Sequence, residues 1–360
     1  MLYIIGFIAL FFLVYYLIYK RLIFVQTVSG AIVMAVGVFS LNVGPNFSEN
    51  ALWYKLLALV TIIIWAFFMT SFAASILTSK FKKIHYEHPI GRFRIGTWVA
   101  STSVTVIIIS NYFPIFNRIV IPLIIINTCL WLIYFIVSIK TIIQIWTGKS
   151  NENVNGILLL TTVSTQSLAL MYNNVWDDFS SYFYINMTLI ILGFIFYLLS
   201  ALLMLKRYVK FTWSLVDDWM APNCILHGAL SIIGSAALIS QTFSYRNLLA
   251  LWSVVFFIFI IHEILEISRG VFRIQRYGFI KGIAFYHPSQ WSRIFTFCMF
   301  YTFTLKFNTN FNIKPACIAS TQEAILIYGK WIIAAILIIE IALLVHSLVT
   351  SQKQFKTSFR

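Results

Sequence analysis

The sequence predicts an all-α protein that crosses a membrane many times. Of its 360 residues, 60% are hydrophobic and only 10% are charged, and the mean hydropathy is +0.88. A soluble domain cannot bury that much apolar surface. The apolar residues also gather into eleven stretches, most of them close to the ~20 residues that a helix needs to span a bilayer. Composition and spacing together therefore exclude a soluble globular domain.

The first stretch, Leu2–Tyr19, ends at Lys20–Arg21. It lacks the basic leading segment and the small-residue cleavage site of a signal peptide, which favours a retained transmembrane helix. Ten further spans are expected at Val25–Val43, Trp53–Leu77, Ile95–Ile109, Arg118–Thr141, Gly156–Met171, Tyr182–Leu205, Pro222–Ser240, Leu248–Ile267, Ser289–Leu305 and Glu323–Val349. We therefore divide the chain into an extra N-terminal transmembrane helix (1–21), a ten-helix domain (22–350) and a basic tail (351–360).

Basic residues indicate the orientation in the membrane. The net charge is +15, and Lys and Arg gather in alternate loops, at 20–21, 80–94, 140–149, 206–210, 269–281 and 353–360. The positive-inside rule places these loops in the cytoplasm. It accounts for the charge without a nucleic-acid partner, so none is expected. We expect a multi-pass plasma-membrane protein whose N-terminus is outside and whose C-terminus is cytoplasmic.

Small and hydroxyl residues recur on alternate spans of the ten-helix domain. The odd spans carry such residues at helical spacing, while the even ones are mostly Ile, Leu, Phe and Trp. This pattern predicts five helical hairpins whose odd members surround a shared pore and whose even members face lipid. The alternative is that small residues only let helices pack closely. The residues assigned to the pore lining are Gly30, Gly37, Thr97, Ser101, Thr105, Thr161, Ser164, Thr165, Gly228, Ser231, Ser235, Cys298 and Thr302.

The stretch Trp291–Thr304 is the expected gate of this pore. Phe295 lies on one helical stripe with Cys298, Met299 and Thr302. A bulky ring beside small and weakly polar side chains can plug a narrow passage through lipid. At the start of this span, Arg293 either extends to the membrane interface, which is ordinary for an arginine, or attracts anions to the pore mouth.

Other chemistry is scarce in the sequence. No catalytic triad, nucleotide loop or metal-ligand spacing occurs at a believable position, so we expect no enzyme activity, no cofactor and no metal site. The four cysteines have no paired spacing either. His262, Glu263 and Glu266 lie near Arg269 and form either an interfacial ion-pair cluster or the coupling site of a transporter. A hydroxyl-lined passage without fixed charge suits an anion channel or uniporter.

Five stretches of the chain, in this order, resemble one known family. They are TVSGAIVMAVGVFS (Thr27–Ser40), HPIGRFR (His88–Arg94), LLTTVSTQSLA (Leu159–Ala169), NCILHGALSIIGSAAL (Asn223–Leu238) and WSRIFT (Trp291–Thr296). Over about residues 26–349 the chain is thereby similar to the tellurite-resistance/C4-dicarboxylate transporter family, which includes the plant slow-type anion channels. The third stretch is the most specific match.

The resemblance implies ten helices in five hairpins with quasi-five-fold symmetry around a central pore. It also implies a homotrimer with one pore in each subunit, and passage of small anions such as chloride, nitrate, sulfite or C4-dicarboxylates like malate. In this family a Phe blocks the pore, and Phe295 stands at the matching position. Thr296 replaces the Pro that usually follows; since a Pro kinks a helix, we expect a straighter helix here.

Three functions remain open at this point. The leading hypothesis is an anion channel or uniporter that opens when Phe295 leaves the pore axis. One alternative is a proton-coupled dicarboxylate or sulfite transporter that uses His262, Glu263 and Glu266. The other is a membrane sensor or assembly subunit without transport activity. No charged pocket in the sequence selects among the anions.

Overall fold

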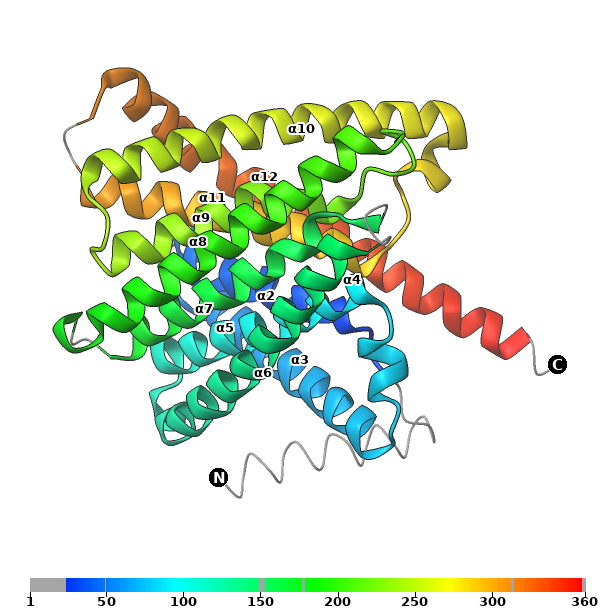
Figure 1. Cartoon of the computed structure of the whole chain (residues 1–360), viewed down its shortest axis with the longest axis horizontal. Coiled ribbons are helices and arrows are strands. Elements are labelled where there is room, and N and C mark those ends of the chain that lie inside the picture. The colour runs from blue at the N-terminus through cyan, green and yellow to red at the C-terminus, as the bar shows by residue number, and fades with distance from the viewer. Residues whose placement is uncertain (1–23, 49, 149–152, 177–178, 312–313, 358–360) are drawn as a thin grey trace.

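A computed structural model describes residues 24–48, 50–148, 153–176, 179–311 and 314–357 (Figure 1). These residues form helices joined by short loops, with no strand among them. Eight of the helical segments are long and apolar enough to cross a membrane. The all-α membrane fold expected from composition is confirmed. The extra N-terminal helix expected at 1–21 lies outside the described residues.

The described residues contain ten long helices that follow one another as five pairs. Their bounds are α2 Gly30–Val38, α3 Leu52–Leu77, α5 Gly96–Tyr112, α6 Val120–Thr147, α7 Leu160–Val175, α8 Phe179–Lys210, α9 Ile225–Ile239, α10 Tyr245–Gly282, α11 Trp291–Asn310 and α12 Ala316–Thr357. A π-helical turn, η2 (Phe39–Val43), and the turn η3 (Gly44–Asn46) continue α2. A four-residue helix, α4 (Pro89–Arg92), precedes α5.

The odd members of the five pairs form a closed ring. Helices α2, α5, α7, α9 and α11 each contact the next in this order, and α11 contacts α2. For three of them, 83–89% of the most apolar 18-residue window is buried, against 17–44% for the five outer helices. The predicted division into inner and outer helices is therefore confirmed. The quasi-five-fold symmetry stays a prediction.

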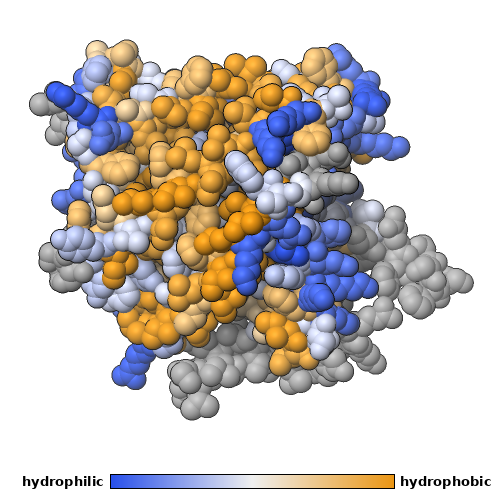
Figure 2. Space-filling view, viewed as in Figure 1, coloured by the Kyte–Doolittle hydropathy of each residue, from blue (hydrophilic) through white to orange (hydrophobic). Residues whose placement is uncertain are grey.

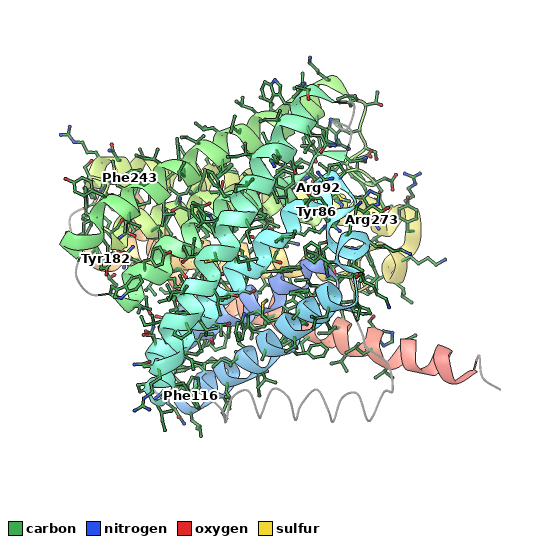
Figure 3. All side chains as sticks on the ribbon, turned by 60° about the horizontal axis from the view of Figure 1, so that its bottom comes forward. Tyr86, Arg92, Phe116, Tyr182, Phe243 and Arg273 are labelled. Carbon is green, nitrogen blue, oxygen red and sulfur yellow. The ribbon has the colours of Figure 1, made fainter. Side chains whose placement is uncertain are left out.

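All five inner helices run in the same direction. Each begins with a short 3-10 turn at one end of the ring: η1 (Thr27–Ser29), η5 (Phe93–Ile95), η8 (Gly156–Leu159), η9 (Ala221–Cys224) and η10 (Pro288–Gln290). Each of these turns contacts the next around the ring. We call this the basic end, because the Arg- and Lys-rich loops lie here, and the other the opposite end. In Figure 3, Tyr86, Arg92 and Arg273 mark the basic end, while Phe116, Tyr182 and Phe243 mark the opposite end.

The outer helices cover the ring with apolar side chains. Helix α3 contacts α2 and α5, α6 contacts α5 and α7, α8 contacts α7 and α9, α10 contacts α9 and α11, and α12 contacts α11. Their outward faces expose many Leu, Ile and Phe residues. Figure 2 shows apolar residues over the middle of one face, with hydrophilic residues mostly toward its edges. This surface suits contact with lipid.

Tryptophans fasten three of the outer helices to the ring. The indole nitrogens of Trp65, Trp131 and Trp252, on α3, α6 and α10, lie 3.0, 3.1 and 3.0 Å from threonine hydroxyls on inner helices. The three acceptors are Thr102, Thr165 and Thr304. In lipid, such bonds and close packing replace the hydrophobic effect as the force between helices. A hydrogen bond from tryptophan to threonine therefore joins an outer helix to the ring in three of the five pairs.

Helix α10 is longer than its apolar stretch suggested. The sequence predicted a span at Leu248–Ile267, but the helix continues to Gly282. Its added turns carry Arg273, whose guanidinium donates to the carbonyls of Val216 and Gly282. Gly278 has a φ of 76° and marks a break near the end of this extension. Hydropathy predicted only the membrane part of α10, because the rest is stabilised by polar contacts at the basic end.

Glycines allow the inner helices to approach closely at the basic end. A Cβ on Gly156, at the start of η8, would lie 2.7 Å from the Cα of Asn223, and its amide donates to the Asn223 side chain. A Cβ on Gly30 would lie 2.6 Å from the Thr97 hydroxyl. Both distances are shorter than van der Waals contact, so a larger residue would force the neighbouring backbone or side chain to move.

We therefore expect Gly156→Ala to lower the stability of the fold by roughly 1–3 kcal/mol, because the methyl group meets rigid backbone of η9. Thermal denaturation of the detergent-solubilised protein measures the effect. Gly270→Ala, on α10, is the matched control, since a Cβ there meets nothing closer than 4.0 Å. An unchanged melting temperature for Gly156→Ala would show that η8 and η9 are not held at this distance.

Candidate functional site

One cavity within the ring receives side chains from all five inner helices. Its volume is about 170 Å³, and it lies in the half of the ring toward the opposite end. Its polar lining residues are Asn42, Ser103, Asn111, Ser167, Asn173, Asn174, Ser235, Thr302 and Lys306, and its apolar ones include Val38, Leu41, Ile232, Phe295 and Met299. A space that all five parallel helices share is a candidate passage through the bundle.

Phe295 lines this cavity from the second turn of α11. Its side chain is almost fully buried, with 2% exposed. Met299, Thr302 and Lys306 follow it along one face of α11, each three or four residues further on. Phe295 is therefore the cavity residue of α11 that lies nearest the basic end.

On the basic side of Phe295 the inner helices are in close contact. The side chain of Thr296 fills the space beside Gly228 of α9: a Cβ on this glycine would lie 2.7 Å from the Thr296 Cβ. The Thr296 hydroxyl donates to the carbonyl of Arg293, 2.9 Å away. Helix α11 runs through this residue without interruption, as expected for a helix that lacks the usual Pro.

The structure places the predicted lining residues in two kinds of position. Phe295, Ser235 and Thr302 line the cavity. Gly30, Gly37 and Gly228 lie at close helix contacts, and Cys298 is fully buried off the cavity. The remaining seven donate their hydroxyls to carbonyls three or four residues earlier in the chain: Thr97, Ser101, Thr105, Thr161, Ser164, Thr165 and Ser231. The Thr165 hydroxyl also accepts a hydrogen bond from the indole of Trp131. That any of these residues contacts a passing ion remains a prediction.

Sequence reasoning missed the polar residues at the far side of the cavity. Lys306 and the four asparagines of the lining lie in or near the last turns of their helices. The signal was present for Lys306, which follows Thr302 by four residues and extends the stripe that starts at Phe295. It went unused because a lysine near a helix end is usually at the membrane interface.

A buried polar cluster lies between α9, α10 and α11, on the basic side of the cavity. Glu266 accepts hydrogen bonds from the indole of Trp219, at 2.9 Å, and from Arg269, at 3.2 Å. The ring of His262 lies 5.9 Å from that of His227, which is fully buried. Neither nitrogen of His227 has a hydrogen-bond partner within the described part of the chain. The cluster therefore combines a satisfied carboxylate with an unsatisfied histidine.

Arg293 is paired and does not stand free at a pore mouth. Its guanidinium forms an ion pair with Glu263 of α10, and the two side chains are 33% and 15% exposed. It also lines a second cavity at the basic end, of about 450 Å³, together with Arg269, Arg273 and Glu266. The carboxylate neutralises the charge that the sequence suggested could attract anions.

The basic end is also where the five inner helices begin, so their dipoles direct partial positive charge toward it. Arg94, just before α5, adds a guanidinium close to His287 of the loop before α11. Burial lowers the pKa of His287, and the charge of Arg94 lowers it further. His287 is therefore neutral near pH 7, and the positive charge here comes from arginines and helix ends.

Comparison with known proteins agrees with this architecture. A family model described as "voltage-dependent anion channel" matches residues 25–339. The chain therefore belongs to the voltage-dependent anion channel family, whose members are channels or transporters, and the resemblance found in the sequence is confirmed. No significant match was found among curated proteins. The chain is a multi-pass membrane protein of an anion channel and transporter family.

We expect Arg293 and Glu263 to be energetically coupled. A double-mutant cycle with Arg293→Gln and Glu263→Gln should give a coupling of about 1–3 kcal/mol, because each single change leaves a mostly buried polar group unpaired. Melting temperatures in detergent provide the measurement. The exposed pair Arg276–Asp217 is the control, in which solvent screens the charges. Equal coupling in both pairs would contradict a buried ion pair between α10 and α11.

Proposed function

We propose that this member of the voltage-dependent anion channel family conducts small anions passively through its ring of inner helices, with Phe295 as the gate. The observation that carries the proposal is the cavity lined by all five inner helices, with Phe295 at its basic side. A passage inside one chain needs such a shared space, whereas small residues that serve only helix packing would leave none. The chloride, nitrate, sulfite and dicarboxylate ions suggested by the sequence are the candidate substrates.

Electrostatics supports anions as the conducted ions. The parallel inner helices direct their positive dipole ends to the basic end. At the other side of Phe295, Lys306 is the one charged residue among the described residues that line the cavity. No carboxylate of the described chain lines it. A cation would thus meet positive potential on both sides of the gate, while an anion would be attracted from either side.

The gating step follows from the size and polarity of the Phe295 side chain. An aromatic ring in a passage about one side chain wide excludes water. An anion that gives up its hydration shell there loses far more hydration free energy than its contacts with ring carbons return. Opening would move the ring away from the axis and let the hydroxyl of Ser235, which has no hydrogen-bond partner among the described residues, contact the ion. The Thr302 hydroxyl would first have to release the carbonyl of Cys298, 2.7 Å away. Such weak donors can stabilise an anion and still release it.

The proposal extends to assembly and location. We place the protein in the plasma membrane with its basic end on the cytoplasmic side, following the distribution of Lys and Arg. The N-terminus is then outside and the C-terminus inside. The resemblance to slow-type anion channels supports a homotrimer in which each subunit has its own pore. The apolar outer faces of the even helices are compatible with contact to lipid or to neighbouring subunits.

A second candidate is a proton-coupled anion transporter. The observation that favours it is the buried cluster of His227, His262 and Glu266, because unsatisfied ionisable groups inside a membrane commonly carry protons. Glu266 argues against it, since both of its oxygens are bound by Trp219 and Arg269. The cluster also lies between helices and shares no residue with the cavity.

We expect Phe295→Ala to raise anion flux in proteoliposomes by about tenfold or more, because removing the ring opens the constriction to water. Phe297→Ala, two residues further along α11, is the matched control: this ring packs on Phe259 of α10 and does not line the cavity. Stopped-flow quenching of an entrapped halide-sensitive dye measures the flux.

The outcomes separate the candidate functions. Equal flux in wild type and Phe295→Ala, with normal insertion, would rule out the gate. Flux that stops when a protonophore removes the proton gradient, at zero membrane potential, would identify the coupled transporter. No flux in any variant would indicate a sensor or assembly subunit.

A further inference from the structure

The cavity changes in character from Phe295 to the opposite end. Near Phe295 its walls are apolar or carry hydroxyls, as at Met299 and Ser235. At the far side they carry an ammonium group, from Lys306 of α11, and carboxamides from three other inner helices. The far side therefore offers what an anion needs: one positive charge and several N–H donors.

Lys306 is the unusual member of this group. Within the part of the chain that the structure describes, its ammonium has no hydrogen-bond or ion-pair partner. Two other lysines near this end are used by the protein: Lys314 donates to Asn308 and to Gln322, and Lys330 donates to the carbonyl of Asn46. A lysine that faces a cavity and is not used by the protein is available to a ligand.

Asparagines from three other inner helices line the cavity together with Lys306. Asn42 lies in the π-helical turn that extends α2, and Asn111 and Asn174 lie in the last turns of α5 and α7. The side-chain oxygen of Asn174 is buried without a partner among the described residues. Because a carboxamide can rotate about its last bond, it can turn its N–H groups toward an anion next to Lys306.

We infer that Lys306, together with Asn42, Asn111 and Asn174, forms a binding site for small monovalent anions on the far side of the gate. This inference rests on the proposed function, because it treats the cavity as part of the conduction path. The site balances one negative charge with one ammonium. A C4-dicarboxylate carries two charges, and the bidentate arginine that binds carboxylates strongly is absent from the described lining of the cavity.

The volume of the cavity favours the same class of ligand. At about 170 Å³ it is smaller than the ~300 Å³ at which pockets for organic molecules begin. Chloride and nitrate fit such a space with a few waters. The site thus narrows the candidate substrates from anions in general to halide- or nitrate-like ions.

The position of the site makes it testable with the gate shut. It lies beyond Phe295, so an anion arriving from the opposite end reaches it without passing the ring. Binding and conduction can therefore be measured separately, which distinguishes failure of this inference from failure of the proposed function.

The binding arm uses the full-length protein in detergent. Chloride or nitrate, added against a gluconate background of equal ionic strength, should raise the melting temperature of the wild type. The rise should be lost in Lys306→Gln and retained in Lys306→Arg and in Lys55→Gln. Lys55 is the matched control, because it is an exposed lysine at the same end of the bundle and lies off the cavity.

The conduction arm uses the Phe295→Ala protein in planar bilayers. Reversal potentials should show that chloride is preferred over malate, and adding Lys306→Gln should reduce chloride conductance about tenfold, as expected when a charge that concentrates ions is removed. Lys55→Gln should not. Malate permeating as well as chloride, or equal effects of the two lysine changes, would overturn the inference. If no variant conducts, the proposed function fails. The melting-temperature measurement then still tests the binding site by itself, because it does not require conduction.

Discussion

The close contact between neighbouring inner helices is the constraint on which the rest of the structure depends. Five helices can surround a common space only if each one touches the next, and lipid supplies no hydrophobic force to hold them there. The chain meets this requirement with small residues at the basic end. Thr296 beside Gly228 closes α9 on α11, and Gly30 lets α2 approach Thr97 of α5. The cavity lies further along the same helices, where all five contribute side chains to its lining.

Much of the architecture could be predicted from the sequence because burial changes composition. An outer helix exposes one face to lipid and an inner helix exposes almost none, so the alternation of apolar and small-residue spans gave the ring directly. The family was predictable for a related reason, since most of the matching motifs, LLTTVSTQSLA among them, lie on inner helices. Charged extensions such as the end of α10 could not be seen, because their contacts depend on the loop that contains Val216.

The candidate site was predictable only in part, because a small residue on a helix has two uses that look alike in sequence. Ser235 and Thr302 line the cavity, whereas Gly228 and Thr97 hold helices together. Which of the two uses a residue has depends on the rotation of its helix about the helix axis. Side chains of consecutive residues point in directions about 100° apart, so a small error in this rotation exchanges the two uses. Thr165 shows this well: its hydroxyl accepts a hydrogen bond from Trp131 of an outer helix.

The parallel direction of the inner helices has a consequence for how selectivity can change. Their dipoles arise from the peptide backbone, so the positive potential at the basic end is inherited with the topology, and side-chain substitution does not remove it. The positive potential at the basic end therefore favours anions there whatever side chains the ring carries. In the conduction path that we propose, a change in ion preference would then arise at the opposite end, where the charge comes from the Lys306 side chain and one substitution can remove it.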